Sequence, residues 1–450
     1  MNKYLVFLLW MSALGNILAQ QAQDSIESGS VALTSGLSTG SFQRAMEPSR
    51  SYSIGFDTNG KTTIAQWKLE GRFAYQRQFK EDILFAGVLD PYDGNPFIWG
   101  DTLSGNWQHD GFDTRVDLAL PRYKNNVFGI TVDYTNATGA RKNGPKPFYR
   151  YRDITIAPRV KTFIAGREDH YLSLKLSYAS AFEENEMGYY STNDTYLIRG
   201  RGYGSALKGP INSLDRRRKS NRYGIHLQWI YTDSWDIKVG SQYRKDNIQD
   251  GLSNPREDGN YMEFQGHGEI NHAISNARYG LLLNYRAGST DDAVFGFENS
   301  EAKEMSAVLS IDLDRKNNHQ FLPEFLLGLF YHQQDDYIVY ADYESQNLLM
   351  QLSRTHKINN IQFYWDIGYQ YNINRQSSVL DPDVLSNLIY YPDFEYRTSD
   401  HLIVDMNPII QWGANKNGKT NFFIKLKNRI LARSTSSIRY IGEVTLGINL

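Results

Sequence analysis

Residues 65–76 read Ala-Gln-Trp-Lys-Leu-Glu-Gly-Arg-Phe-Ala-Tyr-Gln, and this segment indicates the fold class most clearly. Its odd positions are mostly apolar, with Trp67, Leu69, Phe73 and Tyr75, whereas its even positions are mostly charged or amide side chains. Successive side chains of a β-strand point to opposite faces, so this alternation predicts a strand with one apolar and one polar face.

The same period of two returns along the rest of the chain, in runs that begin at Phe128, Leu172, Tyr223, Trp235, Tyr279, Ile361 and Ile438. Several runs extend over about ten residues or more, whereas strands of soluble proteins usually stop near about six. Their apolar faces begin or end in Tyr or Trp, which is typical of the aromatic girdle at a bilayer interface. The pattern therefore predicts transmembrane β-strands.

The composition excludes several other classes of protein. The chain has 450 residues, of which 31 are Tyr, 22 Phe and 8 Trp, and this aromatic content is too high for a disordered protein. A net charge of −2 offers no basic field for nucleic acid. The absence of Cys excludes disulfides, cysteine-ligated zinc and a lipidated cysteine.

We predict an all-β, antiparallel up-and-down barrel of about sixteen strands, with fourteen as the alternative. The expected strands lie near 62–79, 111–120, 127–137, 152–164, 171–183, 220–231, 235–246, 260–272, 277–288, 302–314, 321–334, 337–355, 361–374, 401–412, 420–432 and 438–450. Short connections alternate with longer ones, which are 80–110, 138–151, 184–219, 247–259, 289–301 and 375–400. This alternation, with two short exceptions near Asp335 and Ser434, is expected of periplasmic turns and external loops.

The first sixty residues are expected to lie outside the barrel. Residues 1–19 resemble a secretory signal, with Lys3 before an apolar run and Ala19 before the cleavage site. Residues 20–60 are rich in Ser, Gly and Thr and are interpreted as a periplasmic lead-in or small plug, with a flexible tail as the alternative. The barrel is then expected over 61–450, integral to the outer membrane after the signal is cleaved.

The polar face of the strands is expected to line the lumen. The predicted lumen-lining residues carry charges of both signs, and they are Lys68, Glu70, Arg72, Asp113, Arg115, Asp117, Arg222, Asp366, Lys425, Lys427 and Arg429. Such groups need water or partners. The lumen is therefore either an aqueous passage for a solute or a polar network that packs the interior.

Two long loops carry candidate binding residues. The predicted external-loop binding residues are Tyr92, Trp99, Trp107, Arg199, Arg201, Arg216, Arg217 and Arg218. Aromatic rings among carboxylates in 80–110 suit a carbohydrate, a chelate or a protein partner, but they also suit a loop packed on itself. The basic residues of 184–219 suit a constriction or a binding surface, with a solvated charge run as the alternative.

The sequence offers little sign of catalysis. No His-Glu-x-x-His pair, phosphate-binding Gly loop or spaced acidic calcium loop occurs, so no metal site and no cofactor are predicted. His267 and His272 are expected on opposite faces of a strand. His109 with Asp110, and Asp335 with Asp336, are the only candidate clusters, and ordinary loop polarity is the favoured interpretation of both.

Two segments carry a resemblance to a known family. They are Asp90-Pro-Tyr through Gly100-Asp101-Thr102, and Gly139 to Pro147 followed by Asp153-Ile-Thr-Ile-Ala-Pro158. They resemble an uncharacterised outer-membrane β-barrel family of Gram-negative bacteria that is typically associated with TonB-dependent receptor loci. The resemblance implies a supporting role in nutrient or metal-chelate uptake, beside a TonB-dependent receptor or a surface lipoprotein, in a membrane of lipid and lipopolysaccharide.

The sequence thus predicts a non-enzymatic channel or an accessory component of an uptake system. Two alternatives stay open. An outer-membrane hydrolase requires an acid–His or Ser–His pair that meets in space. A non-conducting adhesion or scaffold barrel predicts a lumen closed by paired charges or loops.

Overall fold

The computed structural model describes residues 26–449 apart from 86, 189–195, 211–213, 233, 252–255, 275–276, 314–322, 414–420 and 435. The predicted signal segment 1–19 lies outside the described residues. Within them, no helix combines the length and the apolar character needed to cross a membrane.

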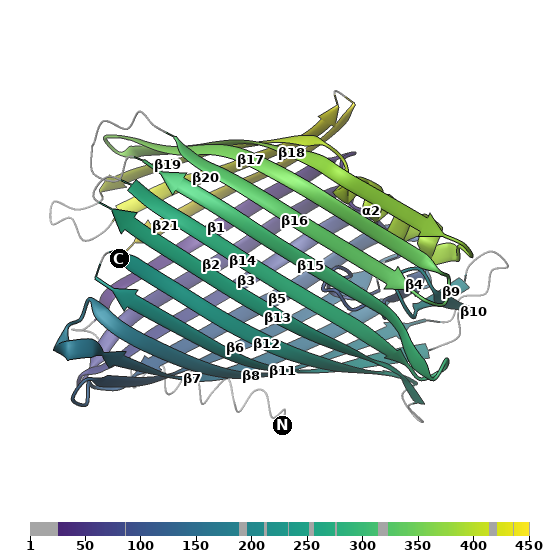
Figure 1. Cartoon of the computed structure of the whole chain (residues 1–450), viewed down its shortest axis with the longest axis horizontal. Helices are drawn as coiled ribbons and strands as arrows, with labels where there is room; N and C mark the ends of the chain where they lie inside the picture. The colour runs from purple at the N-terminus through teal and green to yellow at the C-terminus, as the bar shows by residue number, and fades with distance from the viewer. Residues whose placement is uncertain are drawn as a thin grey trace.

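In the described part of the chain, eighteen strands form one closed antiparallel sheet (Figure 1). They are β1 (Ile26–Gly40), β2 (Arg50–Ile64), β3 (Trp67–Leu84), β5 (Ser104–Ala119), β6 (Asn126–Arg141), β7 (Phe148–Phe163), β8 (His170–Met187), β11 (Leu214–Tyr231), β12 (Trp235–Asp250), β13 (Arg256–Ile274), β14 (Ala277–Asp292), β15 (Phe297–Asp312), β16 (Glu324–Asp336), β17 (Ala341–Ile358), β18 (Ile361–Val379), β19 (His401–Gly413), β20 (Asn421–Ser434) and β21 (Ser437–Asn449). Each pairs with the next barrel strand in the chain, and β1 also pairs with β21, which closes the barrel.

The remaining elements lie in the connections. A small sheet consists of β4 (Trp99–Asp101), β9 (Tyr196–Gly200) and β10 (Ala206–Pro210). The short helices are η1 (Ile164–Gly166), η2 (Ser386–Tyr390) and α2 (Tyr391–Arg397). Figure 1 shows β4, β9, β10 and α2 together at one end of the barrel.

The predicted fold class is confirmed, and every predicted strand overlaps a strand of the barrel, but the predicted counts of sixteen and fourteen are wrong. The missing strands are β1 and β2, which come mainly from the segment 20–60 that was interpreted as a lead-in. Their outward positions do alternate, with Leu33 and Ile54 exposed, but the inward positions are small residues such as Ser30 and Gly55. Small side chains give a weak alternation signal.

The first predicted strand, 62–79, also spans a turn that the alternation concealed. Ala65 and Gln66 have φ angles of 47° and 72° and form a two-residue connection between β2 and β3. Positive φ at both central residues is what a tight hairpin turn of this length requires. The strand that decides the fold therefore begins at Trp67.

The outer face of the barrel is apolar around its middle. Large side chains such as Val239, Leu283 and Leu329 are exposed there, which is unusual for a protein surface in water. Exposed aromatic rings mark both margins of this belt. On the loop side one row crosses four neighbouring strands in register, with Tyr178, Tyr223, Tyr243 and Phe264. On the turn side lie Trp67, Tyr231 and Trp412.

The connections differ at the two ends of the barrel. The turn side carries short connections such as 65–66, 120–125 and 359–360, whereas the loop side carries 85–103 and 380–400. The predicted long connections 138–151 and 289–301 are only 142–147 and 293–296, because the flanking strands extend farther than predicted. The alternation of short and long connections is therefore confirmed only in part. The predicted turn at 315–320 lies outside them.

The apolar belt predicts that the effect of an added charge on folding stability depends strongly on the face of the barrel that carries it. We expect Val239→Arg, at an outward position of β12, to lower the folding stability in lipid vesicles by about 2–4 kcal/mol if it lies near the bilayer midplane. Gln242→Arg, at an inward position of the same strand, is the matched control and should change the stability little. Urea titration of tryptophan fluorescence in vesicles measures both, and equal effects would contradict the assignment of the faces.

Candidate functional site: a loop plug and the cavity beneath it

The loop side of the barrel is closed by a plug made from the connections themselves. We define the plug as residues 41–49, 85–103, 196–210, 337–340 and 380–400 of the described chain. Its small sheet pairs Trp99 with Arg199 and Gly200 with Ala206. Its apolar core draws on every one of these segments, with Met46, Phe85, Ile98, Ile198, Tyr203, Val339, Leu385, Ile389 and Phe394. The plug therefore has a packed interior like that of a small domain.

The predicted aromatic binding residues belong to this packing and do not form an exposed surface in this structure. Trp99 is 1% exposed and packs with Met187 and Leu197. Trp107 is 3% exposed and stacks beside His109. Trp99 therefore packs the loop itself, which is the alternative interpretation of 80–110, whereas Trp107 lies on β5 and packs against Ile83 and Tyr149 of the neighbouring wall.

Tyr92 is packed in the same way. Its hydroxyl accepts a hydrogen bond from the backbone N–H of Met46 at 2.7 Å. Its ring lies under the Arg44 guanidinium, 3.4 Å from the ring centroid. Tyr92 therefore joins two segments of the plug.

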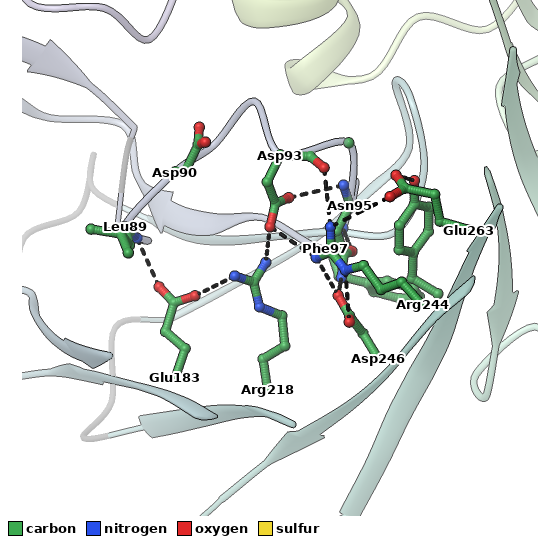
Figure 2. A network of polar contacts seen from close by, with 12 residues as sticks. Leu89, Asp90, Asp93, Asn95, Phe97, Glu183, Arg218, Arg244, Asp246 and Glu263 are labelled. Carbon is green, nitrogen blue, oxygen red and sulfur yellow. Dashed lines mark hydrogen bonds and ion pairs between the residues drawn. The ribbon is translucent and has the colours of Figure 1, made fainter. Parts of the chain in front are cut away.

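A partly buried ion network joins the plug to the barrel wall (Figure 2). The Asp93 carboxylate, from the plug, accepts hydrogen bonds from Arg218 of β11 at 2.8 Å and from Arg244 of β12 at 2.9 Å. Arg244 also pairs with Asp246 at 2.5 Å, and Arg218 pairs with Glu183 at 2.7 Å. Two inward-facing arginines of the wall are thus bridged by one carboxylate of the plug.

Backbone and amide groups of the same loop complete the network. The Asn95 side chain donates to Asp246 at 2.7 Å, and the Leu89 N–H donates to Glu183 at 2.7 Å. The Asp93 carbonyl accepts from Arg244 at 3.1 Å. These contacts supply the wall carboxylates and Arg244 with the partners that buried charges require.

The second network holds the β9 end of the plug. Arg201, 1% exposed, donates to the Asp258 carbonyl at 2.6 Å and pairs with Asp292 at 3.2 Å. Arg216, on β11, pairs with Asp250 at 2.8 Å and donates to the Phe97 carbonyl at 3.1 Å. Two predicted binding arginines, Arg201 and Arg216, therefore act as structural anchors.

Of the remaining predicted arginines, Arg199 also pairs with Asp250, at 2.9 Å. Arg217 lies apart from the plug. It points outward and contacts Glu184 at 3.2 Å. The structure thus brings Arg199, Arg201, Arg216 and Arg218 to the plug and leaves Arg217 on the outer face.

The third network involves residues that the sequence did not single out. Arg44 forms two hydrogen bonds of 2.6 Å with the Asp393 carboxylate, which also accepts from Arg397 at 3.0 Å. Arg397 reaches Glu304 on the wall at 3.1 Å. Arg44 and Asp393 are 349 positions apart in sequence, and no local pattern predicts such a pair.

The two plug carboxylates at the centre of these networks are held charged. Burial favours the neutral acid, but Arg218 and Arg244 outweigh it and hold the pKa of Asp93 well below its usual range. Arg44 and Arg397 likewise lower the pKa of Asp393 against its burial. Both carboxylates therefore keep their charge at neutral pH.

Most predicted lumen-lining residues lie on the inward face and are paired with neighbours across the strands. Arg72 contacts Asp57 at 2.7 Å and Arg429 contacts Asp405 at 2.6 Å. Arg115 with Asp133, Asp117 with Arg159 and Arg222 with Asp153 form further pairs.

Three more of these residues accept hydrogen bonds or face an opposite charge. Thr135 donates to Asp113 at 2.6 Å, and Tyr364 donates to Asp366 at 3.0 Å. Lys427 lies across from Glu443 in register, while Lys68, Glu70 and Lys425 occupy inward positions of their strands. The inner wall is thus largely a network of compensated charges.

A cavity of about 910 Å³ lies inside the barrel beneath the plug. Tyr396 and Arg397 of the plug border it, and inward residues of the wall form most of its remaining lining. The lining includes hydroxyl, amide and imidazole side chains, namely Ser177, His226, Gln242, Gln265, His267, Asn284, Ser306, His332, Ser345, Asn347, Gln370 and His401. Such a lining suits a polar solute that exchanges hydrogen bonds with water for bonds to the wall.

The candidate catalytic clusters are not assembled. His109 points inward and contacts the Tyr149 hydroxyl, whereas Asp110 points outward and pairs with Arg77 at 2.6 Å. Asp336 accepts from the Ser205 N–H inside the barrel, while its neighbour Asp335 is on the other face of β16. Within the described ranges, no group of three or more His, Asp or Glu residues is arranged to hold a metal ion.

Comparison with known proteins identifies the family of the chain. A family of unknown function, DUF6850, matches residues 18–450, so the chain belongs to this family. No curated protein matches the chain.

Several solved structures are similar in shape. The copper transporter OprC has a TM-score of 0.44 at 9% identity over 90% of this chain, which spans 61% of that protein. The siderophore receptor PiuA from Acinetobacter baumannii has a TM-score of 0.46 at 8% identity, covering 93% of this chain and 81% of that one. OccK5 (OpdH) from Pseudomonas aeruginosa has a TM-score of 0.39 at 11% identity, covering 95% and 98%. Likenesses this distant carry no argument about solute or partner.

The ion network predicts that a single wall arginine keeps the plug docked. Removing the side chain in Arg244→Ala leaves Asp93 and Asp246 buried with fewer partners, which costs about 3 kcal/mol or more. Because the chain has no Cys, Ile198→Cys places one reporter thiol in the plug core, where the native side chain is fully buried. We expect Arg244→Ala to accelerate maleimide labelling of this thiol at least tenfold.

Arg77→Ala is the matched control for this measurement. Arg77 also pairs with an aspartate, but on the outer face. Labelling should therefore stay as slow as in the parent protein. Equal acceleration in both variants would contradict a specific role of Arg244 in docking the plug.

Proposed function

We propose that the protein is an outer-membrane β-barrel with its turns in the periplasm and its plug at the cell surface. The closed sheet supports this placement, because it leaves no unpaired strand edge in lipid. The apolar belt between two margins of aromatic rings supports it as well. The long connections 85–103 and 380–400 both lie at the plug end, which supports external loops there.

Within that membrane, the protein serves the uptake of small polar solutes or chelates as an accessory barrel that is closed at rest. The observation that carries this proposal is the plug, whose partly buried Asp93 bridges Arg218 and Arg244 above a polar cavity. A packed plug with a compensated ion network forms a stable closed state. A cavity of this size beneath it offers room for a solute once the plug moves.

The resemblance in sequence supports a partner for this role. Members of the outer-membrane family that the chain resembles are associated with TonB-dependent receptors and surface lipoproteins, and either kind of protein is a candidate partner. Contact with such a partner at the cell surface would supply the energy that undocks the plug. The proposal is non-enzymatic, and the separated His109 and Asp110 support that part of it.

A non-conducting scaffold is the second candidate, and the same plug favours it. The two candidates differ in what lies beneath the plug. A scaffold needs no continuous passage, whereas an uptake component conducts ions once the plug is released.

Electrical recordings in planar bilayers test the proposal. We expect the native protein to be silent at pH 7 and the double variant Arg218→Ala/Arg244→Ala to show steady current, because both bridges to Asp93 are lost. Arg77→Ala should remain silent. Silence of the double variant, with the labelling assay showing its plug released, would reject the passage and leave the scaffold.

The lowered pKa values predict the pH at which the closed state fails. A carboxylate with a lowered pKa in the folded state stabilises it fully above its unfolded pKa, near about 3.9, and this stabilisation is lost as the pH falls through the folded value. The native protein should therefore stay silent from pH 7 to about pH 4 and open only in stronger acid. Opening near pH 6 would show that other groups control the plug.

A further inference from the structure

The outer face of β7, β11 and β12 carries three exposed basic side chains above the aromatic row, which we call the basic patch: Arg152, Lys219 and Lys245. The Arg152 guanidinium lies 5.0 Å from the centroid of the Phe182 ring. Within the described part of the chain, none of the three forms an ion pair with a carboxylate. Exposed cations that have no counterion in the protein are available to bind an anionic group.

The register of the sheet brings these side chains together. Phe182 of β8 is the register partner of Arg152 on β7 and of Lys219 on β11. Arg152 and Lys219 therefore lie two strand-to-strand spacings, or about 10 Å, apart. Lys245 pairs with Asn221, two residues along β11 from Lys219. The three side chains therefore form one patch that a single head group can span.

The height of the basic patch is fixed by the aromatic row below it. Tyr223 lies four residues from Lys219 and Tyr243 two residues from Lys245, and both rings are exposed. At about 3.3 Å per residue, the cations lie roughly 7–13 Å farther along the strands than the rings. Aromatic rows mark the margin of the hydrocarbon core, so the patch lies at the level of lipid head groups.

Several other basic side chains on the outer face have carboxylate partners. Arg77 pairs with Asp110 at 2.6 Å, and Lys303 pairs with Glu301 at 3.3 Å. Arg150 and Arg217, next to the patch on the loop side, both contact Glu184. Among the described residues, the patch thus lacks counterions even though basic side chains next to it have them.

We propose that the basic patch binds the phosphates of lipid A, the bisphosphorylated glycolipid of the outer leaflet. The Arg152 guanidinium fits a phosphate with two parallel hydrogen bonds, and the lysines add compact charges beside it. The aromatic row contacts the upper part of the acyl chains. This inference rests on the proposed outer-membrane placement but is independent of any role in uptake.

Native mass spectrometry of the full protein in detergent tests the proposal. The probes are bisphosphorylated lipid A, the same lipid without phosphates, and inorganic phosphate. We expect the native protein to bind bisphosphorylated lipid A at least tenfold more tightly than the dephosphorylated lipid. The variant Arg152→Gln/Lys219→Gln/Lys245→Gln should lose this preference.

Two further variants keep the result interpretable. Lys303→Gln removes one charge from the same face but from a paired residue, and it should bind lipid A as the native protein does. Lys219→Arg/Lys245→Arg keeps both charges and should bind lipid A as the native protein does. It provides the second measurement if the triple variant fails to fold. Barrel formation is checked by the shift in gel migration on heating.

Three outcomes would overturn the proposal. The first is equal binding of the two lipids, which would indicate contact through acyl chains alone. The second is a triple variant that folds and keeps the native preference. The third is binding of inorganic phosphate at the same concentration at which lipid A binds. The site would then recognise a free anion and not a lipid head group.

Discussion

The structure depends on the hydrogen bonding of its backbone. In a bilayer an unpaired N–H or C=O costs several kcal/mol, so a sheet that spans it must close on itself. Here the closing pair is β1 with β21, which also brings the Thr34 and Thr445 hydroxyls within 3.2 Å. Because backbone pairing provides this closure, β1 can be built from Ser, Gly and Thr without losing its place in the barrel. Strand propensity matters little where neighbouring strands pair the backbone on both sides.

The plug follows a different principle from the wall. The barrel presents its apolar side chains to lipid and its charges to the lumen, so a plug that enters the lumen meets a polar surface. It packs its own apolar core and contacts the wall through ion pairs such as Asp93 with Arg218. Each buried charge requires its partner, and the paired groups therefore fix the position of the plug more strictly than an apolar contact would. The ion networks therefore determine where the plug docks as well as how stably it is held.

The sequence predicted the barrel well because alternation is a local property. The run from Trp67 to Tyr75 or from Tyr223 to Tyr231 shows its two faces without reference to any other part of the chain. β1 and β2 are not predicted from the sequence, because their small inward residues weaken the alternation of apolar and polar side chains. The plug could not be predicted, because contacts such as Arg44 with Asp393 join distant loops. Trp99 and Arg201 are predicted as binding residues of the external loops, but sequence alone does not distinguish a side chain that binds a ligand from one that packs a core.

The dispersed origin of the plug core has a consequence for biogenesis. Its side chains come from positions between Met46 and Phe394, on segments that only the finished cylinder brings together. Closing loops of such length is entropically costly before the strands have paired. The cylinder must therefore form first, and each newly inserted molecule passes through a stage with an unsealed mouth. In the proposed uptake role, the lifetime of that stage, set by the docking of the plug, determines how long a new copy leaves the cell envelope permeable.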